Sequence, residues 1–139
     1  MAFCVLDSSV ALSWFLPGEQ TAQTDGLLNR VTLEGAAAPG LWPLEIANVL
    51  LIAERKDRIS QAQRVRALNA LELLPVSIDP ETASRAGARI FDLATAHGLT
   101  IYDAAYLELA LRTGLKLATL DVALARAAQA TGVAMALEA

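Results

Sequence analysis

The sequence contains one cysteine, one histidine and no long apolar run. Cys4 alone excludes an internal disulfide, and its place in a short apolar run suits a core residue better than a reactive thiol. No segment approaches the roughly 18 uninterrupted apolar residues of a membrane helix. The N-terminus lacks the basic region and the small-residue cleavage site of a secretory signal. We therefore expect a protein of the reducing cytoplasm with no membrane partner.

An excess of positive charge is also missing. Fifteen acidic residues against eleven basic ones give a formal charge of −4, which argues against a protein that binds nucleic acid over its whole surface. Positive charge is nevertheless concentrated in residues 54–66, where it could contact RNA, bind a protein or simply lie in solvent. The basic residues there are Arg55, Lys56, Arg58, Arg64 and Arg66.

Short apolar runs alternate with longer helical segments along the 139 residues. This alternation predicts βαβ units, and hence one three-layer α/β/α domain over residues 1–139 with a mostly parallel central sheet. We expect strands near 3–6, 36–38, 75–78, 116–119 and 133–137.

Capping residues and glycines delimit the expected helices. Asp79 and Pro80 predict the start of a helix over about 80–97, which ends at His97 as a C-terminal cation before Gly98. Thr100 begins a box-like cap for a helix that ends at Gly114. Two further helices, beginning at Pro43 and at Ser60, form an antiparallel pair, and Asp121 precedes a last helix that ends at Gly132.

Four acidic residues fall at one predicted edge of the sheet. Asp7 and Asp121 end strands, whereas Glu45 and Asp103 lie in the first turns of helices. Carboxyl ends of parallel strands share an edge with the helix N-termini that follow them, so these carboxylates can converge. Crowded carboxylates raise each other's pKa, which a divalent cation offsets. With no His or Cys beside them, the four acids suit Mg²⁺ or Mn²⁺ rather than zinc, and such ions act on phosphodiesters.

Three of the four acids also have a simpler interpretation. Asp7 could only cap a helix, and Asp103 could only complete the Thr100 box. The sole role of Glu45 could be a favourable interaction with the dipole of its helix. That helix is apolar nearly all round, however, which predicts that it is buried and that Glu45 faces the site. A phosphatase with an aspartyl nucleophile would need a second acid two residues after Asp7, where Ser9 stands.

Four segments in order carry a family resemblance over essentially the whole chain: VLDSSVAL, PLEIANVL, TIYDAAYLELA and LATLD. Together they resemble a PIN-domain protein, and within that family a VapC-type toxin ribonuclease of a type II toxin–antitoxin system. The resemblance implies a Mg²⁺-dependent (or Mn²⁺-dependent) endoribonuclease of PIN-like fold, inhibited by a cognate antitoxin and forming a homodimer. It matches Asp7, Glu45, Asp103 and Asp121 to the catalytic, metal-binding quartet.

The resemblance also assigns supporting residues. Thr119 matches a hydroxyl residue two positions before the last acid, and Ser8 stands where the family often has Thr. Asn48 lies three residues after Glu45 on the same helical face and could either reach the site or have a surface or capping role. Two other classes stay open: a non-catalytic PIN-like module that binds RNA or protein, and a metal-dependent phosphatase. The absence of a GxxxxGK[ST] loop and of a DxD start argues against the phosphatase or a nucleotide-binding protein.

Aromatic residues near these segments are interpreted as core residues rather than as base-stacking residues, and the two Trp and Phe15 could also line a groove for a partner. This applies to Trp14, Phe15, Trp42, Tyr102 and Tyr106.

Overall fold

Four parallel strands form the central sheet of the computed structural model, which describes residues 2–137. They are β1 (Cys4–Leu6), β2 (Ala36–Ala38), β3 (Val76–Ile78) and β4 (Lys116–Ala118), in the order β3-β2-β1-β4. Val5 pairs with Ala37 on one side and with Leu117 on the other. All three residues of β1 are buried, as expected for a strand covered on both faces. The predicted parallel sheet is confirmed.

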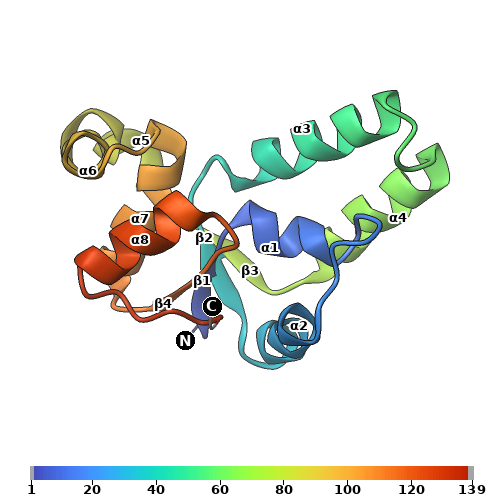
Figure 1. The fold of residues 1–139 in the computed structure, drawn as a ribbon, viewed down its shortest axis with the longest axis horizontal. Helices are drawn as coiled ribbons and strands as arrows, with labels where there is room; N and C mark the ends of the chain where they lie inside the picture. The colour runs from blue at the N-terminus through green and yellow to red at the C-terminus, as the bar shows by residue number, and fades with distance from the viewer. Residues whose placement is uncertain (1, 138–139) are drawn as a thin grey trace.

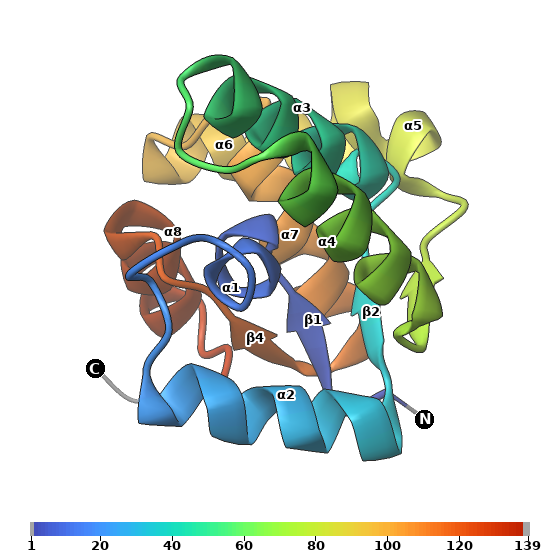
Figure 2. The ribbon, with the colours of Figure 1, turned by 90° about the vertical axis from the view of Figure 1, so that its right-hand side faces the viewer.

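Helices cover both faces of the sheet. One side carries α1 (Ser8–Ser13), α2 (Ala22–Glu34) and the hairpin of α3 (Trp42–Arg55) and α4 (Gln61–Leu73). The other carries α5 (Thr82–Arg85), the π-helical turn η1 (Ala86–Ile90), α6 (Phe91–His97), α7 (Ile101–Thr113) and α8 (Val122–Ala130). Figure 1 shows the sheet between these two sides, and Figure 2 shows α2 across the end where the strands begin.

The expected fifth strand, 133–137, is not a strand in the structure. Its pairing with β4 is limited to a bridge between Met135 and Leu117, supported by two backbone hydrogen bonds. Gly132, with a φ of 82°, turns the chain, and the Val133 N–H donates to the Ala128 carbonyl at 2.8 Å. The start of the segment is therefore tied to the end of α8 rather than to the sheet.

The single helix expected over 80–97 is wrong, because α5, η1 and α6 divide this segment. Asp79 does not cap it; its carboxylate instead binds the guanidinium of Arg112 on α7, with Oδ2 2.6 Å from Nη2. Ala88 interrupts the helix with φ −124° and ψ −106°. The end of α6 is as predicted, with His97 in its last turn and Gly98 left-handed at φ 65°.

The expectation that α3 is buried nearly all round is also wrong. Its buried residues, Trp42, Ile46, Leu50 and Ala53, form one stripe at helical spacing. Leu44 is 75% exposed and Leu51 is 41% exposed. Apolar composition predicted burial here, but α3 projects from the body with α4 as a hairpin and packs along one side only (Figure 1).

The structure also bears on two expectations from the sequence analysis: that the single cysteine is a core residue, and that no segment forms a membrane helix. Cys4 is fully buried, and burial raises the pKa of its thiol to about 12, which confirms a core residue. Within residues 2–137, no helix has both the length and the apolarity needed to cross a bilayer.

Asp79 makes a testable contribution to stability. Burial acts to raise its pKa, but the hydrogen bonds and charge of Arg112 outweigh burial and lower it. A lowered folded-state pKa stabilises the protein above the unfolded pKa of about 3.9, and this contribution is lost as the pH falls through the folded value. We expect Asp79→Asn to lower the free energy of unfolding by about 1–2 kcal/mol at pH 7, with a smaller difference below about pH 4.

Urea unfolding at pH 7 and pH 3 measures this difference. Asp25→Asn, which removes the same charge from an exposed residue, serves as the control. An equal loss of stability for Asp79→Asn at both pH values would show that the carboxylate charge is not responsible.

Candidate active site

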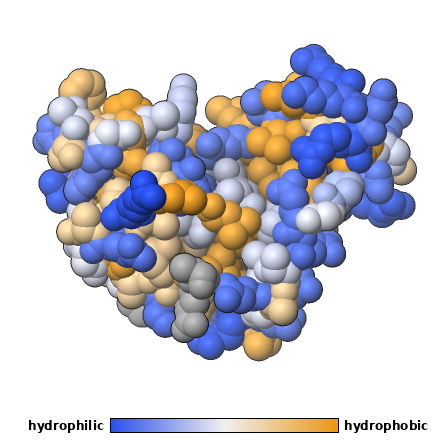
Figure 3. Space-filling model, viewed as in Figure 1, coloured by the Kyte–Doolittle hydropathy of each residue, from blue (hydrophilic) through white to orange (hydrophobic). Residues whose placement is uncertain are grey.

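The four acids predicted from the sequence line one pocket of about 520 Å³ at the edge where the strands end. Asp7 follows β1, Asp121 follows β4, Glu45 lies in the first turn of α3, and Asp103 lies in the first turn of α7. The convergence follows from strand order, because β1 and β4 are neighbours and the acids leave the sheet at the same edge. Figure 3 shows the surface hollowed between the α3–α4 side and the α5–α8 side.

Asp7 is the most buried of the four, with 4% of its surface exposed. Its N–H donates to the Ala118 carbonyl of β4 at 2.9 Å, which fixes the backbone at the end of the strand. The hydroxyls of Ser9 and Thr119 each donate to Oδ2 at 2.7 Å. Burial nevertheless raises the pKa of Asp7 more than these hydroxyls lower it, so the ionised carboxylate is held at a cost in free energy.

Glu45 is held by two hydroxyls from different elements. Tyr106 of α7 donates to its Oε1, and Ser8 donates to the same oxygen at 3.4 Å. Burial is the main cause that raises the pKa of Glu45, and the negative charges of Asp7 and Asp103 add to it. The pKa of Tyr106 is raised in turn, chiefly by its own burial, so the phenol stays protonated and remains a donor.

Asp103 and Asp121 occupy more open positions at helix starts. The Thr100 hydroxyl accepts from the Asp103 N–H at 3.1 Å, while the Asp103 carboxylate lines the pocket. Burial raises the pKa of Asp103, followed by the charges of Asp121 and Asp7. Oδ2 of Asp121 accepts from the Leu124 N–H at 2.8 Å, so this acid does cap α8 as well as facing the pocket.

The donor set fits a divalent ion that prefers oxygen ligands. Four carboxylates face one pocket, and three of them have raised pKa values, so a cation there would relieve burial and repulsion together. The acids surround the pocket without closing on a point: in the described part of the chain, no three His, Cys, Asp or Glu side chains are arranged to hold an ion. Binding an ion therefore requires the side chains of these acids to come closer together.

The supporting residues expected from the sequence fall in different places. Thr119 donates to Asp7 and accepts from the Asp121 N–H at 3.0 Å, so one hydroxyl links two of the acids. Ser8 lines the pocket beside Glu45. Asn48 is exposed on α3 and is not among the residues that line the pocket, where Val49 contributes instead.

The five basic residues of 54–66 do not act as one patch at the pocket. Arg58 lines the pocket, and its Nη2 lies 3.3 Å from Oε2 of Glu19. Arg64 pairs with Glu54 inside the hairpin. The remaining three, Arg55, Lys56 and Arg66, are exposed on the outer part of the hairpin, where Figure 3 shows a strongly hydrophilic surface.

Three residues at the site were not predicted for it. In the sequence, Ser9 was noted only as the residue that stands where a phosphatase would need a second acid, yet it binds Asp7 and also accepts from the Leu120 N–H at 3.1 Å. Tyr106 was assigned to the core, and it is fully buried, but its hydroxyl serves Glu45. Its spacing of three residues from Asp103 was the available signal, since i and i+3 share a helix face. Glu19 carried no signal, because it lies outside the regular elements.

The other aromatic residues follow the core interpretation with one exception. Trp14 and Trp42 are buried, and Phe15 packs partly buried against the core. Tyr102 was expected in the core with Tyr106, but it is 63% exposed, because α7 enters the core only after its first turn.

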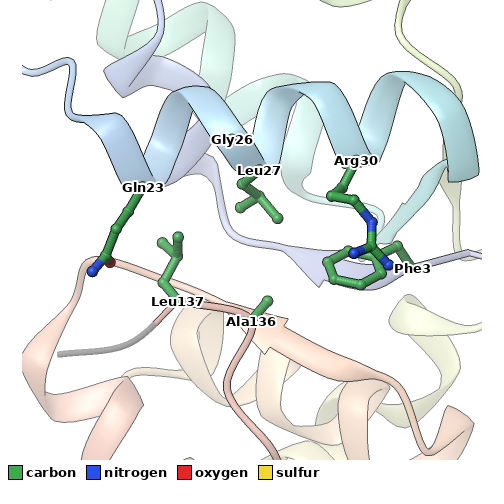
Figure 4. Close-up of a pocket in the computed structure, with 7 residues that line it drawn as sticks. All are labelled: Phe3, Gln23, Gly26, Leu27, Arg30, Ala136 and Leu137. Carbon is green, nitrogen blue, oxygen red and sulfur yellow. The ribbon is translucent and has the colours of Figure 1, made fainter.

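A second hollow, of about 320 Å³, lies between α2 and the chain after α8 (Figure 4). Phe3, Leu27 and Leu137 line it, and Arg30 lies over the Phe3 ring at 4.2 Å from its centroid. Neither Asp nor Glu is among the described residues that line it. The hollow therefore lacks the carboxylates that distinguish the first pocket.

Comparison with known proteins places this geometry in a family. The model of the PIN domain matches residues 4–130. The chain belongs to the PIN-domain family. The matched range includes all four pocket acids and all four strands.

Three individual proteins are also similar to this chain. Ribonuclease VapC3 of Pyrobaculum aerophilum is 30% identical over 125 residues, which cover 87% of this chain and 91% of the relative. The crystal structure of PAE2754 from Pyrobaculum aerophilum superposes with a TM-score of 0.68 at 26% identity, covering 91% of this chain and 84% of the other. That of FitAcB from Neisseria gonorrhoeae gives a TM-score of 0.65 at 19% identity over 95% of both chains, a similarity of fold.

Proposed function

We propose that this PIN-domain chain is a metal-dependent endoribonuclease that hydrolyses RNA phosphodiesters. The observation that carries the proposal is the convergence of four carboxylates on one pocket, with burial raising the pKa of three of them. The relative named a ribonuclease, 30% identical over most of both chains, supports RNA as the substrate. Asp7, Glu45, Asp103 and Asp121 are proposed to hold Mg²⁺ or Mn²⁺.

The residues of the chain supply position and charge. Bound Mg²⁺ or Mn²⁺ would lower the pKa of water and offset negative charge on the cleaved phosphate. Ser9 and Thr119 hold Asp7 by one oxygen, and Tyr106 and Ser8 hold Glu45 by one oxygen. Each of these two carboxylates is therefore anchored through the oxygen that accepts the hydroxyls, and its second oxygen is left to bind an ion in the pocket. Asp121 divides its role between capping α8 and facing the pocket.

An assay with two substrates tests the proposal against its rivals. Purified protein is incubated with end-labelled single-stranded RNA and, separately, with a generic phosphate monoester, each with Mg²⁺, with Mn²⁺ or with EDTA. We expect internal cleavage of RNA with either ion and none in EDTA. Hydrolysis of the monoester alone would favour a phosphatase. RNA binding without cleavage in any ion would favour a non-catalytic module, and full cleavage in EDTA would contradict the metal mechanism.

The same resemblance supports a biological setting. We propose that the chain, as a single domain over residues 1–139, is the toxin of a toxin–antitoxin pair in the cytoplasm. A cognate antitoxin protein would inhibit it, and it would form a homodimer. Sequencing the ends of RNAs cleaved after induced expression, with and without the cognate antitoxin, tests the pairing and identifies the target.

Tyr106 offers a test of how far the positioning of Glu45 matters. Phe at this position keeps the buried ring but removes the donor to Glu45, whose Oε1 then keeps only the longer bond from Ser8. We expect Tyr106→Phe to lower kcat for RNA cleavage about tenfold, since lost partners of metal ligands cost about 10–100-fold. Tyr102→Phe, on the exposed first turn of α7, is the control and should keep full activity. Unchanged kcat in Tyr106→Phe would reduce Tyr106 to a packing role.

A further inference from the structure

We propose that Arg58 binds a backbone phosphate of the RNA beside the cleaved one, and that Glu19 occupies Arg58 in the free protein as an internal competitor. The inference rests on the proposed endoribonuclease function and adds a substrate-positioning pair to it. Among the described residues that line the acid pocket, Arg58 is the one basic side chain, set against the four acids and Glu19. RNA entering this pocket meets one positive charge, and Glu19 already holds it.

The backbone fixes where Arg58 lies. The turn after α3 has Asp57 in the left-handed region at φ 58°, and the Arg58 N–H donates to the Ala53 carbonyl at 2.9 Å. This backbone bond reaches five residues back and closes the end of α3 in the manner of a Schellman turn. Ile59 follows and is buried, which anchors the far side of the turn. Arg58 is thus presented at the pocket by a defined turn, although its side chain extends into solvent.

The pair with Glu19 is suited to exchange. It joins the turn after α3 to the segment between α1 and α2, at a separation of 3.3 Å, and the two side chains are 51% and 39% exposed. Ion pairs this exposed contribute little to folding, so breaking one costs little. A phosphate offers Arg58 the same bidentate oxygens as a carboxylate, with the added gain of released counterions. Phosphate can therefore replace Glu19 without disturbing the fold.

The position of Arg58 selects a flanking phosphate. Glu45 and Ala53 are eight residues apart on α3, which corresponds to about 12 Å along the helix, and Arg58 lies beyond Ala53 at the same end. This separation along α3 favours a phosphate beside the cleaved one as the contact of Arg58. Arg58 would thus set the register of the strand across the pocket, which makes it a positioning residue.

The test uses the full chain and two matched pairs of variants. Arg58→Gln and Glu19→Gln are compared with Arg30→Gln and Glu34→Gln, because Arg30 and Glu34 form a similarly exposed ion pair on α2, at the opposite edge of the sheet (Figure 2). KM and kcat are measured on single-stranded RNA with Mg²⁺. Binding of fluorescein-labelled RNA is measured separately by anisotropy in EDTA, over a series of salt concentrations, so that this readout does not depend on cleavage.

We expect Arg58→Gln to raise KM about tenfold with little change in kcat, and to reduce the salt slope of binding by about 0.7. Glu19→Gln should lower KM about two- to fourfold. Arg58→Lys should restore much of the binding and the slope, whereas the α2 variants should match the wild type. If the wild-type protein cleaves RNA but Arg58→Gln behaves like Arg30→Gln, the inference is wrong and the proposed function survives. If the wild-type protein does not cleave RNA, the proposed function itself fails.

Discussion

Asn in place of Asp7 should reduce RNA cleavage about 100-fold or more while the protein stays folded. Asp7 is the most buried of the four acids: it is 4% exposed and directly follows β1, a central strand of the sheet. The amide oxygen of Asn can keep the bonds from Ser9 and Thr119 that now end on Oδ2. The variant therefore removes the charge and one potential ligand oxygen and leaves the surrounding contacts in place.

The same variant should be more heat-stable than the wild type in EDTA. Burial raises the pKa of Asp7, so the folded wild-type protein holds an unfavourable buried charge at neutral pH. Asn removes this charge. Asp92→Asn, an exposed acid in the first turn of α6, is the control and should change neither cleavage nor melting temperature appreciably. Full activity in Asp7→Asn would remove Asp7 from the site.

Asp121→Asn should be milder than Asp7→Asn. Oδ2 of Asp121 is already engaged with the Leu124 N–H, and Asn caps helices as well as Asp does. A loss of activity in Asp121→Asn as large as in Asp7→Asn would show that the pocket-facing oxygen dominates.

The sheet and the meeting of the acids could be predicted because both follow from chain order. A buried apolar run that ends in Asp7, and another that ends near Asp121, need only the rule that parallel strands share an edge. Glu45 and Asp103 were found through the helix starts at Pro43 and Thr100, which are local signals. The position of each of the four acids was thus predicted from its neighbours in sequence, and in the structure all four line one pocket.

The errors arise where distant residues decide local structure. Asp79 resembles a helix cap, but Arg112, 33 residues later, binds its carboxylate, and the helix that follows has no side-chain cap. The start of α2 was not predicted, because its capping box pairs Thr21 with Thr24 in place of the usual Glu or Gln. The orientation of the projecting α3–α4 hairpin decides how exposed α3 is and brings Arg58 to Glu19. Neither the periodicity nor the composition of the sequence predicts that orientation.

Mg²⁺ or Mn²⁺ should stabilise the wild-type protein strongly against heat. Only the folded chain gathers the four acids, so an ion at about 100 times its Kd should add about 2.7 kcal/mol, or roughly 10 °C in Tm for a domain of this size. The effect should exceed that of the ion on ordinary surface acids, because here it offsets burial and repulsion in Glu45 and Asp103 as well as in Asp7. Scanning calorimetry over a series of ion concentrations gives the shift and the Kd together.

Glu45→Gln separates this site from general ion effects. Gln keeps an oxygen for the Tyr106 hydroxyl but removes the charge, so most of the ion-dependent shift in Tm should disappear. Glu34→Gln removes the same charge from an exposed ion pair on α2 and should keep the full shift. Equal shifts in the two variants would place the stabilising ion elsewhere. The pocket acids would then have to tolerate their raised pKa values without a cation, which would leave protonation of one of them as the means of relieving the repulsion.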